Sequence, residues 1–104
     1  MNYVSTRDKN NRVSSAEAIA HGISKEGGLF VPESFPKFSG EDFENLKKLD
    51  YIGRAKYVLK NFLTDFTEEE LDYCVNGAYT GSFDEDKPAP MARLGENINM
   101  VELW

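Results

Sequence analysis

The sequence predicts a small α/β or α+β domain with about four helices and a few short strands. Two segments have the Ser/Thr-x-x-Glu spacing of a capping box, which marks a helix start. Short runs of strand-forming residues lie between or after the helical segments. A chain of 104 residues with 40% hydrophobic residues is long enough and apolar enough for one domain with a core.

The N-terminal part predicts a strand followed by a helix. Residues 2–6 are rich in strand formers, and the polar residues 7–12 predict a turn. Ser14 and Glu17 form the first capping box, and Gly22 lies where this helix is expected to end. Helical spacing places four apolar residues on one face of this helix: Ala16, Ile19, Ala20 and Ile23.

Gly27 and Gly28 make a definite demand on the backbone. Two glycines before an apolar run predict a turn with a positive φ and the close approach of another segment. Residues 29–31 then predict a short strand that ends at Pro32. Two interpretations of the turn stay open here: an ordinary connection into a core strand, or a stretch of backbone that lines a site.

The middle of the chain predicts three helices. They cover residues 41–49, residues 53–63 and a segment that starts at the second capping box, Thr67 and Glu70. Acidic residues open the first of these helices and lysines close it, which agrees with the helix dipole. The side chains expected to face inward are Phe43, Leu46 and Leu49; Ala55, Val58, Leu59 and Phe62; and Leu71, Cys74, Val75 and Ala78.

The sequence changes character after the last predicted helix. Residues 84–87 are charged, and residues 88–90 (Pro-Ala-Pro) suit a stiff, extended connector. Residues 91–94 and 98–104 predict strands. An apolar strand that ends on Trp104 favours a chain that continues, because an exposed strand and indole seek a partner.

These observations divide the chain in two. Residues 1–87 are expected to form an N-terminal domain. Residues 88–104 are expected to form a connector and a strand that lead into a further domain.

Charge and composition exclude several classes of function. The formal net charge is −6, and the densest basic group is the pair Lys47 and Lys48, so nucleic acid and anionic membranes are not expected partners. The single cysteine, Cys74, cannot form an internal disulfide and is expected to be buried. No stretch approaches the roughly 20 apolar residues of a membrane span. We expect a soluble cytoplasmic protein.

A search for catalytic chemistry finds no convincing group. Nucleotide-binding loops, Cys-x-x-Cys and His-Glu-x-x-His are absent from the sequence. His21 is expected to be a surface or capping residue, and a pair with Cys74 is disfavoured because a buried thiol is inert. The eight lysines lie in polar turns or on polar helix faces, where none suits a Schiff base. We therefore expect no catalytic residue, metal ligand or bound cofactor in this chain.

Several segments of the chain form a pattern in their order and spacing: residues 3–7 (YVSTR), 17–22, 26–32 (EGGLFVP), 66–71 (FTEEEL), 78–79 (AY), 90–94 and 101–104 (VELW). Taken together and in this order, they resemble the long-type threonine synthase family. Two departures occur in turns: Asp8 stands where the family often has Gly, and Glu26 where it often has Asp.

The resemblance implies an enzyme that is larger than this chain. In the family, a strand like residues 101–104 runs into the motif whose lysine carries pyridoxal phosphate, so that lysine would lie beyond Trp104. The implied fold is that of the tryptophan-synthase-β-like pyridoxal phosphate enzymes, and the implied reaction converts O-phosphohomoserine and water to threonine and phosphate. The implied partner is the rest of the threonine synthase chain, and this chain alone is expected to be inactive.

Two hypotheses follow for particular residues. Ser5, Thr6 and Arg7 offer hydroxyls and a guanidinium of the kind that bind phosphate, which makes them candidates for substrate binding. The alternative function is a stand-alone, non-catalytic interaction module that binds a protein partner through the strand edge at residues 101–104.

Overall fold

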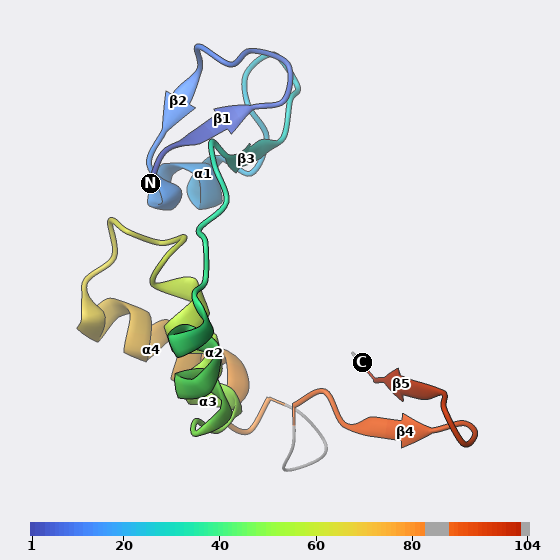
Figure 1. Cartoon of the computed structure of the whole chain (residues 1–104). Coiled ribbons are helices and arrows are strands. Elements are labelled where there is room, and N and C mark those ends of the chain that lie inside the picture. The colour runs from blue at the N-terminus through green and yellow to red at the C-terminus, as the bar shows by residue number, and fades with distance from the viewer. Residues whose placement is uncertain (83–87, 103–104) are drawn as a thin grey trace.

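The computed structural model describes residues 1–82 and 88–102, and its elements fall into three groups along the chain (Figure 1). We call residues 2–33 the sheet unit, residues 39–80 the helical unit and residues 90–102 the hairpin. All strand pairs among the described residues are antiparallel, and three of the four helices there lie together in the helical unit, so the class is α+β. The elements are β1 (Tyr3–Ser5), β2 (Arg12–Val13), α1 (Ser15–His21), β3 (Phe30–Pro32), α2 (Gly40–Lys47), α3 (Tyr51–Leu59), α4 (Glu68–Tyr79), β4 (Met91–Arg93) and β5 (Asn99–Val101).

The sheet unit is built on β1, which lies between β2 and β3. Val4 pairs with Arg12 on one side and with Val31 on the other. Strand β2 lies at the end of the polar run that the sequence predicted as a turn. The turn before it is closed by the Asn11 N–H, which donates to the Asp8 carbonyl at 3.1 Å, and this places Arg12 opposite β1.

Helix α1 starts and ends where the sequence predicted. The Ser14 hydroxyl accepts the Glu17 N–H at 3.2 Å, and the Glu17 carboxylate accepts the Ser14 N–H at 3.0 Å. Gly22 ends the helix with φ 68°, a left-handed value that favours glycine. The first capping box is therefore confirmed.

The buried face of α1 differs from the predicted one. Ser15 and Ala18 are buried, whereas Ile19 and Ile23 are 63% and 61% exposed. Spacing shows which residues share a face, but not which face another element covers. Strand β3 is an edge strand in which Val31 is 39% exposed, while Phe30 and Pro32 are half-buried.

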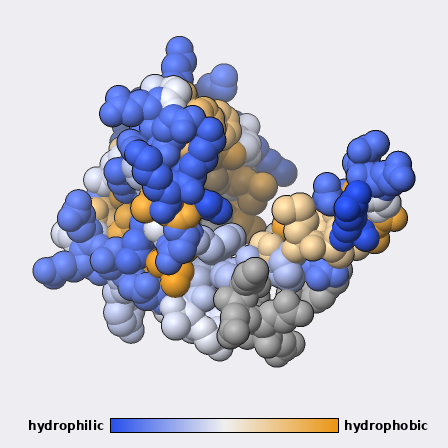
Figure 2. Space-filling model, turned by 60° about the horizontal axis from the view of Figure 1, so that its bottom comes forward, coloured by the Kyte–Doolittle hydropathy of each residue, from blue (hydrophilic) through white to orange (hydrophobic). Residues whose placement is uncertain are grey.

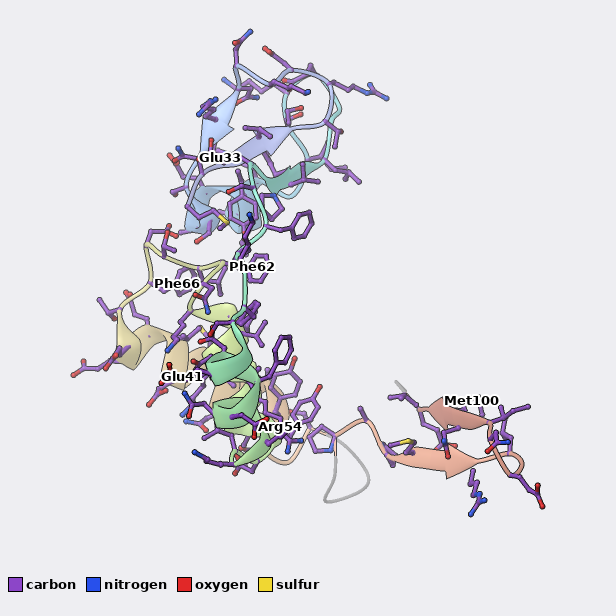
Figure 3. The ribbon with its side chains drawn as sticks, viewed as in Figure 1. Glu33, Glu41, Arg54, Phe62, Phe66 and Met100 are labelled. Carbon is purple, nitrogen blue, oxygen red and sulfur yellow. The ribbon has the colours of Figure 1, made fainter. Side chains whose placement is uncertain are left out.

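The helical unit consists of three helices that polar contacts join. The Tyr57 hydroxyl of α3 donates to the Asp42 carboxylate of α2 at 2.6 Å. Lys56 of α3 pairs with Asp72 of α4 at 2.8 Å. Arg54, labelled in Figure 3, donates from Nε to the carbonyl oxygen at the end of α2, that of Leu46, at 2.9 Å.

Packing of α3 against α4 buries a narrow stripe of α4. Leu71 and Val75 are 6% and 2% exposed, as expected from the second capping box and its spacing. Cys74 is exposed, which contradicts the prediction of a buried thiol. The other residues predicted to face inward but found exposed are Ala78 and, on α2, Phe43 at 55%. Only one helix covers α4 closely, so residues on the flanks of the stripe stay in solvent.

Strands β4 and β5 form a hairpin that stands apart from the helices, and Figure 2 shows it projecting from the body of the molecule. Met100, labelled in Figure 3, lies far from the other two units. Within the described part of the predicted strand at residues 98–104, β5 covers Asn99–Val101. Residues 83–87, which include the charged residues 84–87, and residues 103–104, with Trp104, lie outside the described residues.

The chain exposes more surface than an isolated domain of its size. Its radius of gyration is 16.5 Å, against about 13 Å for a compact domain of this length. Its accessible surface is 8005 Å², against about 5,900 Å² for a folded monomer of 11.8 kDa. Within the described residues, no helix is long and apolar enough to cross a membrane.

The core of α4 generates a stability prediction. We expect Leu71→Ala to lower the free energy of unfolding by about 2–5 kcal/mol, because it removes a buried side chain and leaves a cavity. Tyr73→Ala on the same helix serves as the control, because Tyr73 is 82% exposed and should change stability by less than about 1 kcal/mol. Urea unfolding measures both variants, and equal losses would contradict the burial of this face.

Candidate functional site

The candidate site lies where the end of β1 meets the turn before β3. The Thr6 N–H donates to the Leu29 carbonyl at 2.9 Å, and the Thr6 hydroxyl accepts the Leu29 N–H at 3.0 Å. These reciprocal bonds extend the pairing of β1 with β3 by one residue. They hold residues 5–7 against residues 24–28.

Two serine hydroxyls form the buried centre of this site. Ser5 is fully buried, and its hydroxyl shares a 3.0 Å hydrogen bond with the hydroxyl of Ser24. The Ser24 hydroxyl donates to the Gly28 carbonyl and accepts the Gly28 N–H, both at 2.9 Å. The Ser5 hydroxyl also accepts the Arg7 N–H at 3.2 Å. The serines therefore fix the turn to the strand end.

The two glycines form the tight turn that the sequence predicted. Gly27 has φ 80°, and a Cβ at Gly28 would lie 2.2 Å from the Ser5 hydroxyl oxygen. A positive φ and a close approach by another segment are thus both confirmed.

Arg7 is the exposed cationic group of the site. Its Nη1 donates to the Glu26 backbone carbonyl at 3.1 Å, which is its one side-chain hydrogen bond among the described residues. The ion pairs in the described part of the chain join other residues, so the Arg7 charge has no carboxylate partner there. The remaining guanidinium N–H groups are available for an anion.

Glu26 is the acidic group beside Arg7. Both of its carboxylate oxygens lie 3.3 Å from the Asn11 amide nitrogen, which donates to them. The hydroxyl of Ser5 and then the Glu26 backbone N–H favour the ionised form and lower the pKa of Glu26 to about 2. Glu26 is therefore a carboxylate at neutral pH and does not suit proton transfer.

The structure brings Ser5, Thr6 and Arg7 together at one end of β1. Ser5 is buried and its hydroxyl is bonded to Ser24, whereas Thr6 and Arg7 are both exposed; the Thr6 hydroxyl accepts the Leu29 N–H, and Arg7 is the charged group that faces solvent. Sequence reasoning did not single out Ser24, because its contact with Ser5 joins residues that are distant in the sequence. His21 is exposed in the last turn of α1, as expected.

Groups for metal binding were sought across the described residues. No cluster of three or more His, Cys, Asp or Glu side chains that could hold a metal ion occurs there.

The close contact at Gly28 gives a second prediction. We expect Gly28→Ala to lower the free energy of unfolding by about 1–3 kcal/mol, because the added Cβ would overlap the Ser5 hydroxyl and overpack the turn. Gly77→Ala is the matched control: apart from its chain neighbours and its own helix backbone, no atom of the described residues lies within 4 Å of its Cβ position, and alanine in a helix stabilises by up to about 1 kcal/mol. Thermal unfolding measures both variants. Stabilisation by Gly28→Ala would contradict the contact.

Three carboxylates predict a loss of stability in acid. Like Glu26, Asp42 has a pKa of about 2, mainly because the Tyr57 hydroxyl donates to it. Desolvation raises the pKa of Asp65, but hydrogen bonds from the Ser15 hydroxyl and a backbone N–H outweigh it and lower the pKa to about 2.

Unfolded carboxyls titrate near about pH 4, so these three groups stabilise the fold fully above about pH 4.5. We expect the free energy of unfolding to fall between about pH 4.5 and about pH 2. Urea titrations across this range measure it, and Glu26→Gln should make the pH dependence shallower. A stability that stays constant down to about pH 2 would rule out this linkage.

Comparison with known protein families identifies the N-terminal part of the chain. The family model described as threonine synthase N terminus matches residues 2–79. This range contains the whole sheet unit and all of the helices of the helical unit.

Curated relatives extend the match beyond residue 79. Threonine synthase of Escherichia coli (strain K12) is 31% identical over 105 residues, covering 100% of this chain and 23% of the relative. Threonine synthase-like 1 of Mus musculus is 36% identical over 92 residues, covering 86% of this chain and 12% of the relative. The chain thus spans less than a quarter of the length of these relatives.

Solved structures share the fold. The crystal structure of threonine synthase from Escherichia coli superimposes with a TM-score of 0.83 at 31% identity, covering 98% of this chain and 23% of that one. The pyridoxal-phosphate-bound threonine synthase from Brucella melitensis gives a TM-score of 0.87 at 29% identity, covering 98% of this chain and 22% of that one. The resemblance found in the sequence is confirmed, and the chain belongs to the threonine synthase N-terminus family.

Proposed function

We propose that this chain is the N-terminal domain of a pyridoxal-phosphate-dependent threonine synthase, which converts O-phosphohomoserine and water to threonine and phosphate. The observation that carries the proposal is the family match over residues 2–79. The similar enzyme from Brucella melitensis binds pyridoxal phosphate, a cofactor that acts as an electron sink for carbanions.

The described residues do not fit a site for this cofactor. Six of the seven lysines in the described part of the chain are exposed, and Lys56 is engaged with Asp72. A lysine that forms a Schiff base is normally desolvated among apolar groups. We therefore propose that cofactor binding belongs to protein outside this chain, and we expect this chain alone to be inactive.

The role that we propose for the domain is to pack against the cofactor-binding domains and exclude water from the active site. In this proposal residues 1–87 form the N-terminal domain and residues 88–104 connect it to the catalytic part. The hairpin supports this, because an isolated two-stranded hairpin is marginally stable at best. Its apolar face consists of Ala92, Leu94, Ile98 and Met100, of which Leu94 and Ile98 are each 62% exposed.

Within the site, we assign phosphate recognition to Arg7. A guanidinium matches the geometry of phosphate and keeps its charge at every physiological pH. Arg7 is exposed and lacks a carboxylate partner in the described part of the chain. Ser5 and Thr6 then support the strand end that carries Arg7, through the bonds to Ser24 and Leu29.

The cytoplasm is the location that we propose. Cys74 is an exposed free thiol, and such groups persist in reducing compartments. The partners in this proposal are the rest of the threonine synthase chain and the small-molecule substrate.

The activity has a direct test. We expect full-length protein supplied with pyridoxal phosphate to release phosphate from O-phosphohomoserine and to form threonine in equal amounts. Residues 1–104 alone serve as the control and should release none. Absence of both products from the full-length protein would contradict the proposed reaction.

The assignment of Arg7 is tested in the full-length enzyme. A lost charge-assisted hydrogen bond costs about 1.5–3 kcal/mol, so Arg7→Ala should lower kcat/KM by roughly tenfold to a hundredfold. Arg12→Ala is the matched control, because Arg12 lies on the same unit but pairs with Glu33 at 2.7 Å. An unchanged kcat/KM in Arg7→Ala would contradict the assignment of phosphate recognition to Arg7.

A further inference from the structure

Among the described residues, no helix or strand of the sheet unit makes a substantial contact with a helix of the helical unit. The substantial contacts between elements all lie inside the three groups: β1 with β2 and β3, α3 with α2 and α4, and β4 with β5. Figure 3 shows Phe62 and Phe66 at the junction of the two units, in the segment between α3 and α4. This segment, residues 62–66, therefore forms the seam between the units.

Polar bonds cross the seam at three places. The N-terminal ammonium donates to the Thr64 hydroxyl, and the Tyr3 hydroxyl donates to the Phe62 carbonyl at 3.4 Å. The third place is Asp65, whose carboxylate accepts the Ser15 hydroxyl on one oxygen and a backbone N–H on the other. That N–H belongs to Ala16, at 3.0 Å.

Asp65 differs from the other two links in being negatively charged and in binding the start of a helix. It is the carboxylate of the seam, and it binds the first turn of α1, where helix N–H groups lack partners within the helix. Ser15, its hydroxyl partner, is fully buried. A charged acceptor with two donors, one of them a buried hydroxyl, fixes direction better than one long neutral bond.

The covalent link between the units is weakly restrained. Residues 34–38 form an extended connecting segment, without helix or strand, between the sheet unit and α2 (Figure 1). No backbone hydrogen bond of the described residues involves residues 34–38. The rings of Phe35 and Phe62 lie edge to face with their centroids 6.4 Å apart, but Phe35 remains 78% exposed. This segment has the features of a hinge, since little besides the seam sets the angle between the units.

We propose that Asp65 is a positioning residue that latches α1 to the helical unit and thereby sets the orientation of the sheet unit about residues 34–38. Tyr3 opens β1 at the seam, and Arg7 follows the other end of the same strand. A change of angle at the latch therefore displaces Arg7. The consequence for catalysis rests on the proposed function, whereas the latch itself does not.

The chain offers a matched control for the latch. Asp50 also caps a helix, and its carboxylate accepts the Gly53 N–H at 2.7 Å. Both partners of this bond lie inside the helical unit, at the start of α3. Asp50→Ala therefore removes a cap of the same chemistry without touching the seam.

The test uses full-length protein with spin labels at Lys9 and Lys48, which are both exposed and lie in different units, and with Cys74→Ser to remove the exposed thiol. Pulsed electron paramagnetic resonance measures the distance between the labels. We expect Asp65→Ala to broaden or shift the distance distribution, and Asp50→Ala to leave it as in the parent protein. Ser15→Ala, which removes one of the two bonds, should broaden it less.

Distance distributions that are the same for Asp65→Ala and Asp50→Ala would overturn the proposal. The kinetics separate the latch from the proposed function. We expect Asp65→Ala to raise KM for O-phosphohomoserine several-fold while Asp50→Ala leaves it unchanged. A broadened distribution with an unchanged KM would support the latch and count against the role of Arg7 in substrate binding.

Discussion

Each of the four helices in the described part of the chain begins at a residue whose side-chain oxygen accepts a backbone N–H of the first turn. Such caps stabilise a helix by about 1 kcal/mol each. They matter more here than in a large domain, because few large apolar side chains are fully buried. The units keep their shape through caps and short polar networks. The four N-cap residues are Ser14, Ser39, Asp50 and Thr67.

The same chemistry extends from single helices to the candidate site and the seam. Ser5 and Ser24 fix a glycine turn to a strand end, so that Arg7 is held at a defined place without a core beneath it. The Asp65 carboxylate accepts a backbone N–H at the start of α1, so here a capping interaction joins two units instead of lying within one. Directional polar bonds can orient parts of a protein that hydrophobic contact alone would leave free to slide.

Local signals in the sequence predicted the class of the fold and most of its elements. The Thr67 and Glu70 capping box, for example, located α4 correctly, because its two partners lie three residues apart. Burial was predicted less well, as Ile19 and Cys74 show. Helical spacing identifies residues on one face, but coverage depends on elements that are distant in sequence.

In the candidate site, too, local backbone features could be predicted, whereas contacts between distant residues could not. The glycine pair predicted a positive φ, found at Gly27, and a close contact, found at Gly28, because both features favour glycine. The contact partner, Ser5, could not be deduced, since the pairing of β1 with β3 joins residues far apart in the sequence. A resemblance across several segments supplied the family, which no single motif could have done.

The central claim is that this domain obtains part of its burial from protein outside residues 1–104. Amide hydrogen exchange, measured on residues 1–104 alone and on full-length protein, tests it most directly. We expect the amides of α1 and of the hairpin to be strongly protected only in the full-length protein. Equal protection in the two proteins would contradict the claim and favour an independent module.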